Sequence, residues 1–347
     1  MLHKSVRFFR NIPVIWSLFI GMTVWVCFIS YMHFLLNTET SKRQVVSLGY
    51  MPVVTNLAAP ILDHVSKTTG NIRYKAMKYS SFAEMAESLR NGQIDAAFII
   101  APLSIVLRQQ GEDVKVVYIG NRHESTFVAK KSLAVKDLND LIGKSVAVPM
   151  RYSGHNLSIL KLIEEKGLTG SINVVEMNPP DMAAALSSGA LDAYFVGEPF
   201  AAQTLKSGDA SLVNYVEDLW PGFICNLMVV RQSFIDKEPD IVQQLVQSAA
   251  RSGLWAQKNS NAAIKIASRY WNQSESLVEY AMTTPRDRIV FNQFVPVVAE
   301  LQSMADLMKK FNMIENTDIS GLVDDQFARS SILENISTVE SIISINH

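Results

Sequence analysis

Residues 179–202 read PPDMAAALSSGALDAYFVGEPFAA, and this stretch decides the fold class. Pro179 and Pro180 suit the first turn of a helix, which Gly189 would end. The apolar run at 191–197 then predicts a buried strand, and Glu198 stands where the next helix opens. A helix, a strand and a helix in direct succession indicate α/β layering.

The same pattern occurs a second time, earlier in the chain. N-G-Q-I-D-A at 91–96 parallels S-G-A-L-D-A at 188–193, because each places a glycine, an apolar residue and an aspartate before a strand. Each copy also lies about 45 residues after the first strand of its unit. We therefore expect two similar lobes with a crevice between them.

The segments around these copies alternate short apolar runs with helical patterns. We expect strands at 45–50, 72–79, 94–100, 114–120, 144–149, 172–177, 191–197 and 211–216, and an apolar run at 223–230. From there to about residue 313 the chain reads as helical, so this part must cover existing lobes. The expected fold class is α/β and two-lobed, with residues 44–134 as the first part of lobe one and 135–230 as lobe two. Residues 231–347 would be a helical return that completes lobe one and ends in a tail.

The N-terminal segment has the composition of a membrane span. No residue between Arg10 and Glu39 carries a formal charge, and residues 13–36 read PVIWSLFIGMTVWVCFISYMHFLL. This length suffices to cross roughly 30 Å of hydrocarbon as a helix. The basic residues Lys4, Arg7 and Arg10 precede it, which keeps the N-terminus cytoplasmic and the body outside. We expect residues 1–43 to be a cytoplasmic stub and transmembrane anchor in the inner membrane; a cleaved signal with a long apolar region is the alternative.

Charge and motif content exclude several classes of function. Beyond residue 43 the chain has 27 basic and 32 acidic residues, a net charge of −5, and no basic stripe, which argues against a nucleic-acid partner. Two cysteines, Cys27 and Cys225, cannot build a disulfide framework. The six histidines include no H-x-x-x-H pair, and no G-x-S-x-G turn occurs. We expect no enzyme activity, no metal and no cofactor.

Candidate ligand-binding residues follow from a rule on open α/β sheets, where ligands lie beyond the carboxyl ends of the strands. In lobe one this rule selects Tyr50, Met51, Thr55, Asn56, Ser80, Ser81, Ala101 and Pro102. In lobe two it selects Arg151, Tyr152, Ser153, His155, Asn156, Asp181, Glu198 and Phe200.

Two of these candidates favour different ligands. The turn R-Y-S-G-H-N at 151–156 enters a helix, so its backbone N–H groups favour an anion, and Arg151 suits a carboxylate, sulfonate or nitrate. Glu198 would instead accept a hydrogen bond from an amine or a ring N–H, and it would disfavour a bare anion. We favour a small anionic or polar metabolite, with an aminopyrimidine as the alternative.

Four segments carry a resemblance to a known family: GYMPVVTNLAAP at 49–60, residues 143–168, residues 179–202 and GLVDDQFARSS at 321–331. The chain resembles the nitrate/sulfonate/taurine/bicarbonate group of periplasmic solute-binding proteins, which includes thiamine-pyrimidine binders. The resemblance implies a type II periplasmic-binding-protein fold with two hinge strands, and ABC permease and ATPase subunits as partners. Members of this group are usually released or lipid-anchored, whereas this chain keeps a spanning helix. A tethered ligand sensor that signals through a partner is the rival role.

Overall fold

The computed structural model describes residues 14–37 and 43–344, which belong to two compact units. The first unit, residues 1–44, contains α1 (Val14–Asn37), which covers the expected span at 13–36. The side chains from Trp16 to Phe34 are exposed and apolar enough for the helix to cross a membrane. A signal sequence would have the same properties, so α1 is a candidate anchor.

The second unit, residues 45–347, is built on two five-stranded sheets. The strand order of the first sheet is β2 (Ile72–Lys78), β1 (Gln44–Tyr50), β3 (Ala96–Ile100), β10 (Asn226–Arg231) and β4 (Val114–Ile119). That of the second is β7 (Asn173–Glu176), β6 (Ser145–Val148), β8 (Ala193–Gly197), β5 (Ser125–Lys130) and β9 (Ala210–Tyr215). The two sheets confirm the two-lobed α/β fold.

The lobes exchange one strand each. β5 follows directly on lobe one but pairs antiparallel with β8 and β9, and β10 follows lobe two but pairs antiparallel with β3 and β4. Sequence analysis did not identify β5 as a strand, and it expected 125–134 in lobe one and 226–230 in lobe two. The sheets instead divide the lobes at residues 120–124 and 222–225, because each crossing segment continues as a strand of the other sheet.

The repeated aspartates have the same structural role in both lobes. The Asp95 carboxylate accepts the backbone N–H of Ser47 on β1 at 2.7 Å, and that of Asp192 accepts the N–H of Ser145 on β6 at 3.0 Å. Each aspartate therefore joins the start of a central strand to the first strand of its lobe, and this explains why the pattern occurs twice.

Helices cover both sheets. Lobe one carries α2 (Ala58–Ser66), α3 (Phe82–Arg90) and α4 (Ala101–Gln109), and lobe two carries α5 (Gly154–Glu165), α6 (Pro179–Ser188), α7 (Phe200–Ser207) and α8 (Val216–Leu219). The short 3-10 helices are η2 (Val54–Asn56), η3 (Lys131–Leu133), η4 (Leu138–Leu141) and η5 (Glu340–Ile342). The predicted helix end at Gly189 is confirmed, since this residue ends α6 in the left-handed conformation. At the start of α3 the Ser81 hydroxyl accepts the N–H of Glu84.

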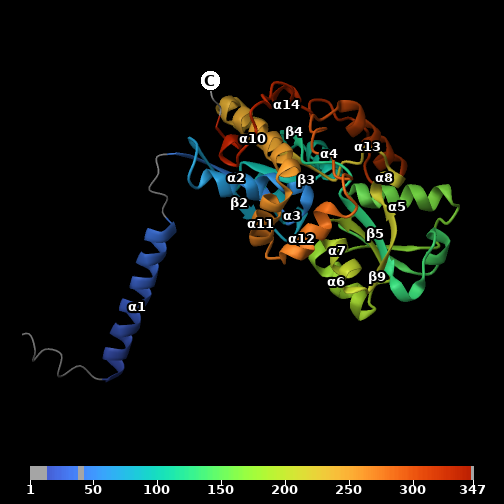
Figure 1. Cartoon of the computed structure of the whole chain (residues 1–347), viewed down its shortest axis with the longest axis horizontal. Coiled ribbons are helices and arrows are strands. Elements are labelled where there is room, and N and C mark those ends of the chain that lie inside the picture. The colour runs from blue at the N-terminus through green and yellow to red at the C-terminus, as the bar shows by residue number, and fades with distance from the viewer. Residues whose placement is uncertain (1–13, 38–42, 345–347) are drawn as a thin grey trace, which may run out of the picture. The chain divides into compact units, whose positions relative to one another are not determined.

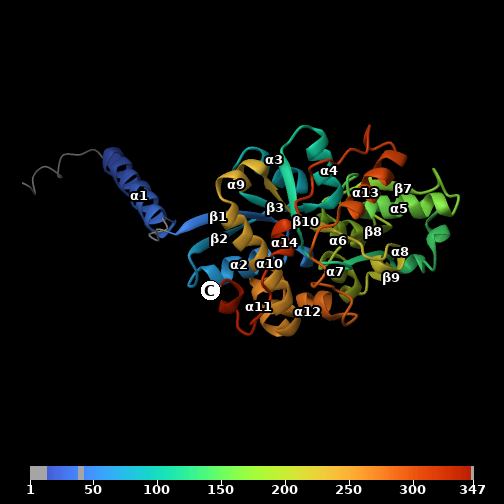
Figure 2. The same cartoon turned by 90° about the horizontal axis from the view of Figure 1, so that it is seen from above.

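The helical last third covers both lobes rather than lobe one alone. It comprises α9 (Gln232–Lys237), α10 (Pro239–Lys258), α11 (Ser260–Trp271), α12 (Glu275–Thr283), α13 (Val298–Lys310) and α14 (Gln326–Arg329). α10 and α11 pack on α2 of lobe one, and α12 packs against α7 of lobe two (Figures 1 and 2). α13 packs against both α4 of lobe one and α5 of lobe two.

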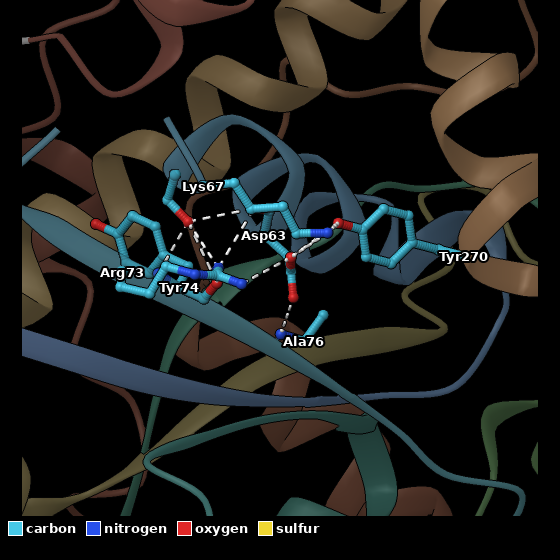
Figure 3. Close-up of polar contacts among 7 residues, drawn as sticks. Asp63, Lys67, Arg73, Tyr74, Ala76 and Tyr270 are labelled. Atoms are coloured by element: carbon cyan, nitrogen blue, oxygen red, sulfur yellow. Dashed lines mark hydrogen bonds and ion pairs between the residues drawn. The ribbon is translucent and has the colours of Figure 1, made fainter. Parts of the chain in front are cut away.

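A buried carboxylate, that of Asp63, links this last third to lobe one (Figure 3). The Asp63 carboxylate on α2 accepts hydrogen bonds from the Arg73 guanidinium at 3.2 Å, the Tyr270 hydroxyl at 2.8 Å and the Ala76 N–H at 2.8 Å. Donors from β2 and α11 therefore surround one carboxylate on α2, and the hydrogen-bonding capacity of the cluster is used within the fold. We assign it a structural role.

Candidate ligand-binding site

The two lobes meet through the backbone at the carboxyl ends of β1 and β8. The N–H of Val54 in lobe one donates to the carbonyl of Glu198 in lobe two at 2.8 Å. Beside it, the Asn226 amide donates to the Asn56 side chain at 2.8 Å, and the Asn56 amide donates to the Met51 carbonyl at 3.1 Å. These buried polar groups lie at the strand ends where a ligand between the lobes would bind.

Glu198 is the buried acid at this meeting point. One carboxylate oxygen accepts the Thr126 hydroxyl at 2.7 Å, and the other accepts the N–H of Ala202 in the first turn of α7 at 2.8 Å. Burial removes water from the charged form and raises the pKa of Glu198 to about 7, although the two donors oppose this effect. The side chain is thus a hydrogen-bond acceptor near its point of ionisation at neutral pH.

A second carboxyl, Glu124, lies directly behind Glu198. Its Oε2 accepts the backbone N–H of Glu198 at 2.7 Å, and its Oε1 accepts the Ser125 hydroxyl at 3.2 Å. Burial also raises the pKa of Glu124. A Cβ at Gly197 would lie 2.8 Å from both Glu124 oxygens, so the glycine gives this carboxyl its place.

His155 is buried beside Ser125 and is a neutral imidazole. Its Nε2 lies 2.9 Å from the Ser125 hydroxyl, and its ring stands edge-on to those of Phe195 and Phe223. Burial lowers the pKa of His155 to about 3. Its Nδ1 has no hydrogen-bond partner among the residues that the structure describes.

The turn 151–156, which predicted an anion site, uses its polar groups internally. Ser153 accepts the N–H of Asn156 at 3.1 Å, the Asn156 amide donates to the Arg151 carbonyl at 2.8 Å, and Glu176 accepts the N–H of Arg151 at 2.7 Å. The Arg151 guanidinium is exposed and stacks on the half-buried Tyr152 ring at 5.0 Å. In this conformation the arginine faces solvent rather than Glu198.

A groove of about 250 Å³ lies where α3 of lobe one faces lobe two. Ser81 lines it from lobe one, together with Phe82 and Ala83. Its lining from lobe two is Pro149, Met150, Glu176, Met177 and Asn178. This groove places the predicted residue Ser81 between the lobes, at their rim.

The other predicted residues are divided between the site and its surroundings. Met51, Thr55 and Phe200 are buried near the meeting point, and the Ala101 N–H, beside Pro102 at the start of α4, donates to the Cys225 carbonyl at 3.0 Å. The Tyr50 hydroxyl instead donates to the Tyr270 carbonyl at 3.2 Å, and Ser80 and Asp181 are exposed.

The family follows from a comparison of sequences. The profile of the NMT1-like family matches residues 39–269, which is more than half of the chain. This chain belongs to the NMT1-like family.

Two relatives and one solved structure show how far this similarity extends. A Bacillus subtilis protein, provisionally named as an aliphatic sulfonates-binding protein, is 25% identical over 77% of this chain and 80% of its own length. The taurine-binding periplasmic protein of Escherichia coli is 27% identical over 50% of this chain and 54% of its own length. The ligand-binding component of an ABC-type import system from Staphylococcus aureus, solved with zinc bound, has a TM-score of 0.76 at 21% identity and covers 84% of this chain and 100% of that one.

Sequence analysis missed four residues of this candidate site: Glu124, Thr126, Asn226 and Arg288. Glu124 ends the crossing segment 120–124, and Thr126 and Asn226 lie at the start of β5 and β10. The polar run N-R-H-E-S-T at 121–126 directly before an apolar stretch was the available signal for Glu124 and Thr126. Arg288 lies beyond the residues that the family profile matches, and its partners are more than 70 residues away in the chain.

Proposed function

We propose that this chain is the extracytoplasmic solute-binding component of an ABC importer, and that it holds a small polar metabolite through an amino group placed on Glu198. The supporting observation is a buried carboxyl at the backbone contact between the lobes, with Val54 of lobe one hydrogen-bonded to Glu198 itself. Membership of the NMT1-like family and the two-sheet fold support the binding role.

The chemistry of the site favours an amino-sulfonate over a bare anion. Two buried carboxyls, Glu198 and Glu124, would repel a ligand that is only negative, whereas an ammonium or amino N–H would be attracted to them. An acidic end on the same molecule would agree with the names of the two relatives, one for sulfonates and one for taurine. The start of α3 in the groove, with the Ser81 cap, offers backbone N–H groups to such an end.

The proposed location is the outer face of the cytoplasmic membrane, with α1 as a retained anchor and a permease and ATPase as partners. The apolar α1 and the basic residues before it support this arrangement. Mass spectrometry of the mature protein should find a chain that still contains residues 14–37. A mature chain that starts near residue 40 would contradict the anchor.

A thermal-shift screen of the full-length chain in detergent tests the ligand class. The compounds are taurine, ethanesulfonate, nitrate, bicarbonate and 4-aminopyrimidine. We expect taurine to stabilise the protein, by about 2.7 kcal/mol at a concentration 100 times its dissociation constant, and ethanesulfonate to have little effect because it lacks the amine. The Glu198→Gln variant should lose the taurine shift.

The control is Arg151→Ala, which removes the solvent-facing arginine of the predicted anion turn and should leave the taurine shift unchanged. Stabilisation by nitrate or ethanesulfonate alone, retained in Glu198→Gln and lost in Arg151→Ala, would contradict the amino-group proposal. A shift with 4-aminopyrimidine alone would keep the role of Glu198 but replace the ligand class.

A further inference from the structure

Arg288 reaches the binding site from the last third of the chain. The segment that carries Arg288 connects α12 to α13 and runs beside the crossing segment 120–124, where Val290 pairs with Arg122. The Arg288 guanidinium is buried and forms a two-pronged ion pair with Glu217, at 2.9 and 3.0 Å. It also donates to the Ser125 carbonyl at 2.7 Å.

A further N–H of Arg288, on Nη1, determines the direction of a hydrogen bond in the site. Nη1 donates to the Thr126 hydroxyl oxygen at 3.0 Å. A guanidinium can only donate, so the single hydrogen of the Thr126 hydroxyl must point elsewhere. The acceptor it meets is Oε1 of Glu198, at 2.7 Å.

This direction matters because Glu198 must accept a hydrogen bond from the ligand. A buried carboxyl without donors would hold a proton at neutral pH and would no longer attract an ammonium group. The Thr126 hydroxyl on one oxygen and the Ala202 N–H on the other favour the carboxylate form.

We propose that Arg288 is a positioning residue for ligand capture: it turns the Thr126 hydroxyl onto Glu198 and so keeps that side chain an acceptor for the ligand's amino group. The inference rests on the proposed function for the identity of the ligand group. The two hydrogen bonds, from Arg288 to Thr126 and from Thr126 to Glu198, are present in the ligand-free protein. The inference assigns a binding role to a residue outside the region that the family profile matches.

Other groups near Glu198 would influence the same titration, so the test must separate them. The acids Glu124 and Glu217 and the buried His155 and Cys225 lie around it, with His123 close to Glu217. The phenols that face it come from β8, β9 and α12: Tyr194, Tyr215 and Tyr280.

The test measures the titration of Glu198 by ¹³C NMR of glutamate-labelled, full-length protein in nanodiscs, with the signal identified by its loss in Glu198→Gln. Thr126→Val removes the hydroxyl, and Arg288→Met removes the group that orients it. We expect each to raise the midpoint by about one pH unit, and to weaken taurine binding at pH 7 by about fivefold, since the ionised fraction of Glu198 falls by that factor. The double variant should shift less than the two changes added together, because Arg288 acts through the hydroxyl.

Two variants serve as controls. Thr126→Ser keeps the hydroxyl, so the titration midpoint of Glu198 should equal that of the wild type. Arg122→Met breaks the comparable buried ion pair with Glu300, at 2.7 and 3.0 Å, but touches neither Thr126 nor Glu198 among the contacts described. If Arg288→Met does not fold, Arg288→Lys, which keeps the charge but not the forked donors, should show a smaller shift in the same direction.

If the Glu198 midpoint is the same in Arg288→Met as in Arg122→Met, Arg288 has only a structural role and the inference is overturned. An unchanged midpoint in Thr126→Val would overturn it as well. Loss of taurine binding in Glu198→Gln alongside either result would leave the proposed function intact. Unchanged taurine binding in Glu198→Gln would instead contradict the proposed function, whatever the midpoints.

Discussion

At the scale of single residues, the site depends on acids that the fold removes from water. Burial raises the pKa of Glu198 to about 7, so the folded protein holds a proton that the unfolded chain releases above pH 4.5. Stability contributed by this proton is present at low pH and is lost as pH rises through 7. The neutral His155 acts in the opposite sense, because its lowered pKa costs stability as pH falls below 6.5.

The comparison of wild type with Glu198→Gln isolates the first effect. Between about pH 4.5 and 7 the free energy of unfolding of the ligand-free wild type should fall more steeply than that of the variant, with an accumulated difference on the order of 3 kcal/mol once the pH is above 7. Chemical denaturation at a series of pH values measures both curves. Parallel curves would mean that Glu198 titrates as it does in the unfolded chain.

At the scale of elements, one buried carboxylate links lobe one to α11 of the helical last third. Asp63 on α2 holds Arg73 from β2 and Tyr270 from α11, and the side chains of Asp63 and Arg73 are about one-tenth exposed or less. Breaking a buried ion pair by removing one charge costs more than the pair contributes, since the other charge remains buried.

We therefore expect Asp63→Asn to lower the free energy of unfolding by about 3–5 kcal/mol. The matched control is Lys67→Met, which removes a cation 3.4 Å from the same carboxylate. Because the Lys67 side chain is 53% exposed, this change should lower the free energy of unfolding by less than about 1 kcal/mol. Denaturant unfolding provides both values. Equal losses would show that burial does not distinguish the two contacts.

At the scale of the whole molecule, we expect the crossing segments to let the lobes open and close. They continue as β5 and β10, so each lobe would move with a strand that belongs to its own sheet. The Val54–Glu198 hydrogen bond joins the lobes in this structure, and we expect it to break when they open. A ligand that contacts both lobes stabilises the closed arrangement.

Solution scattering should accordingly give a smaller radius of gyration with saturating taurine than without it. Glu198→Gln at the same taurine concentration should keep the ligand-free radius. A wild-type profile that does not change at saturation would contradict capture by lobe closure.

The amino-acid sequence by itself determined the features that depend on neighbouring residues. Apolar runs located every strand except β5, Gly189 marked a helix end, and the repeated glycine–aspartate pattern predicted two lobes, because turns and periodicity act within a few residues. Glu198 was found in the same way, as the first polar residue after a strand.

Only the tertiary structure decided which distant residues meet. Glu124 contacts Glu198 across 74 positions and Arg288 contacts Thr126 across 162, through strands that the lobes exchange. Such contacts depend on how sheets and helices pack rather than on local pattern. The tertiary structure also turned Arg151 to solvent, since Glu176 and Asn156 bind the backbone of its turn. Local chemistry thus predicted where a ligand would bind, and packing decided which groups would face it.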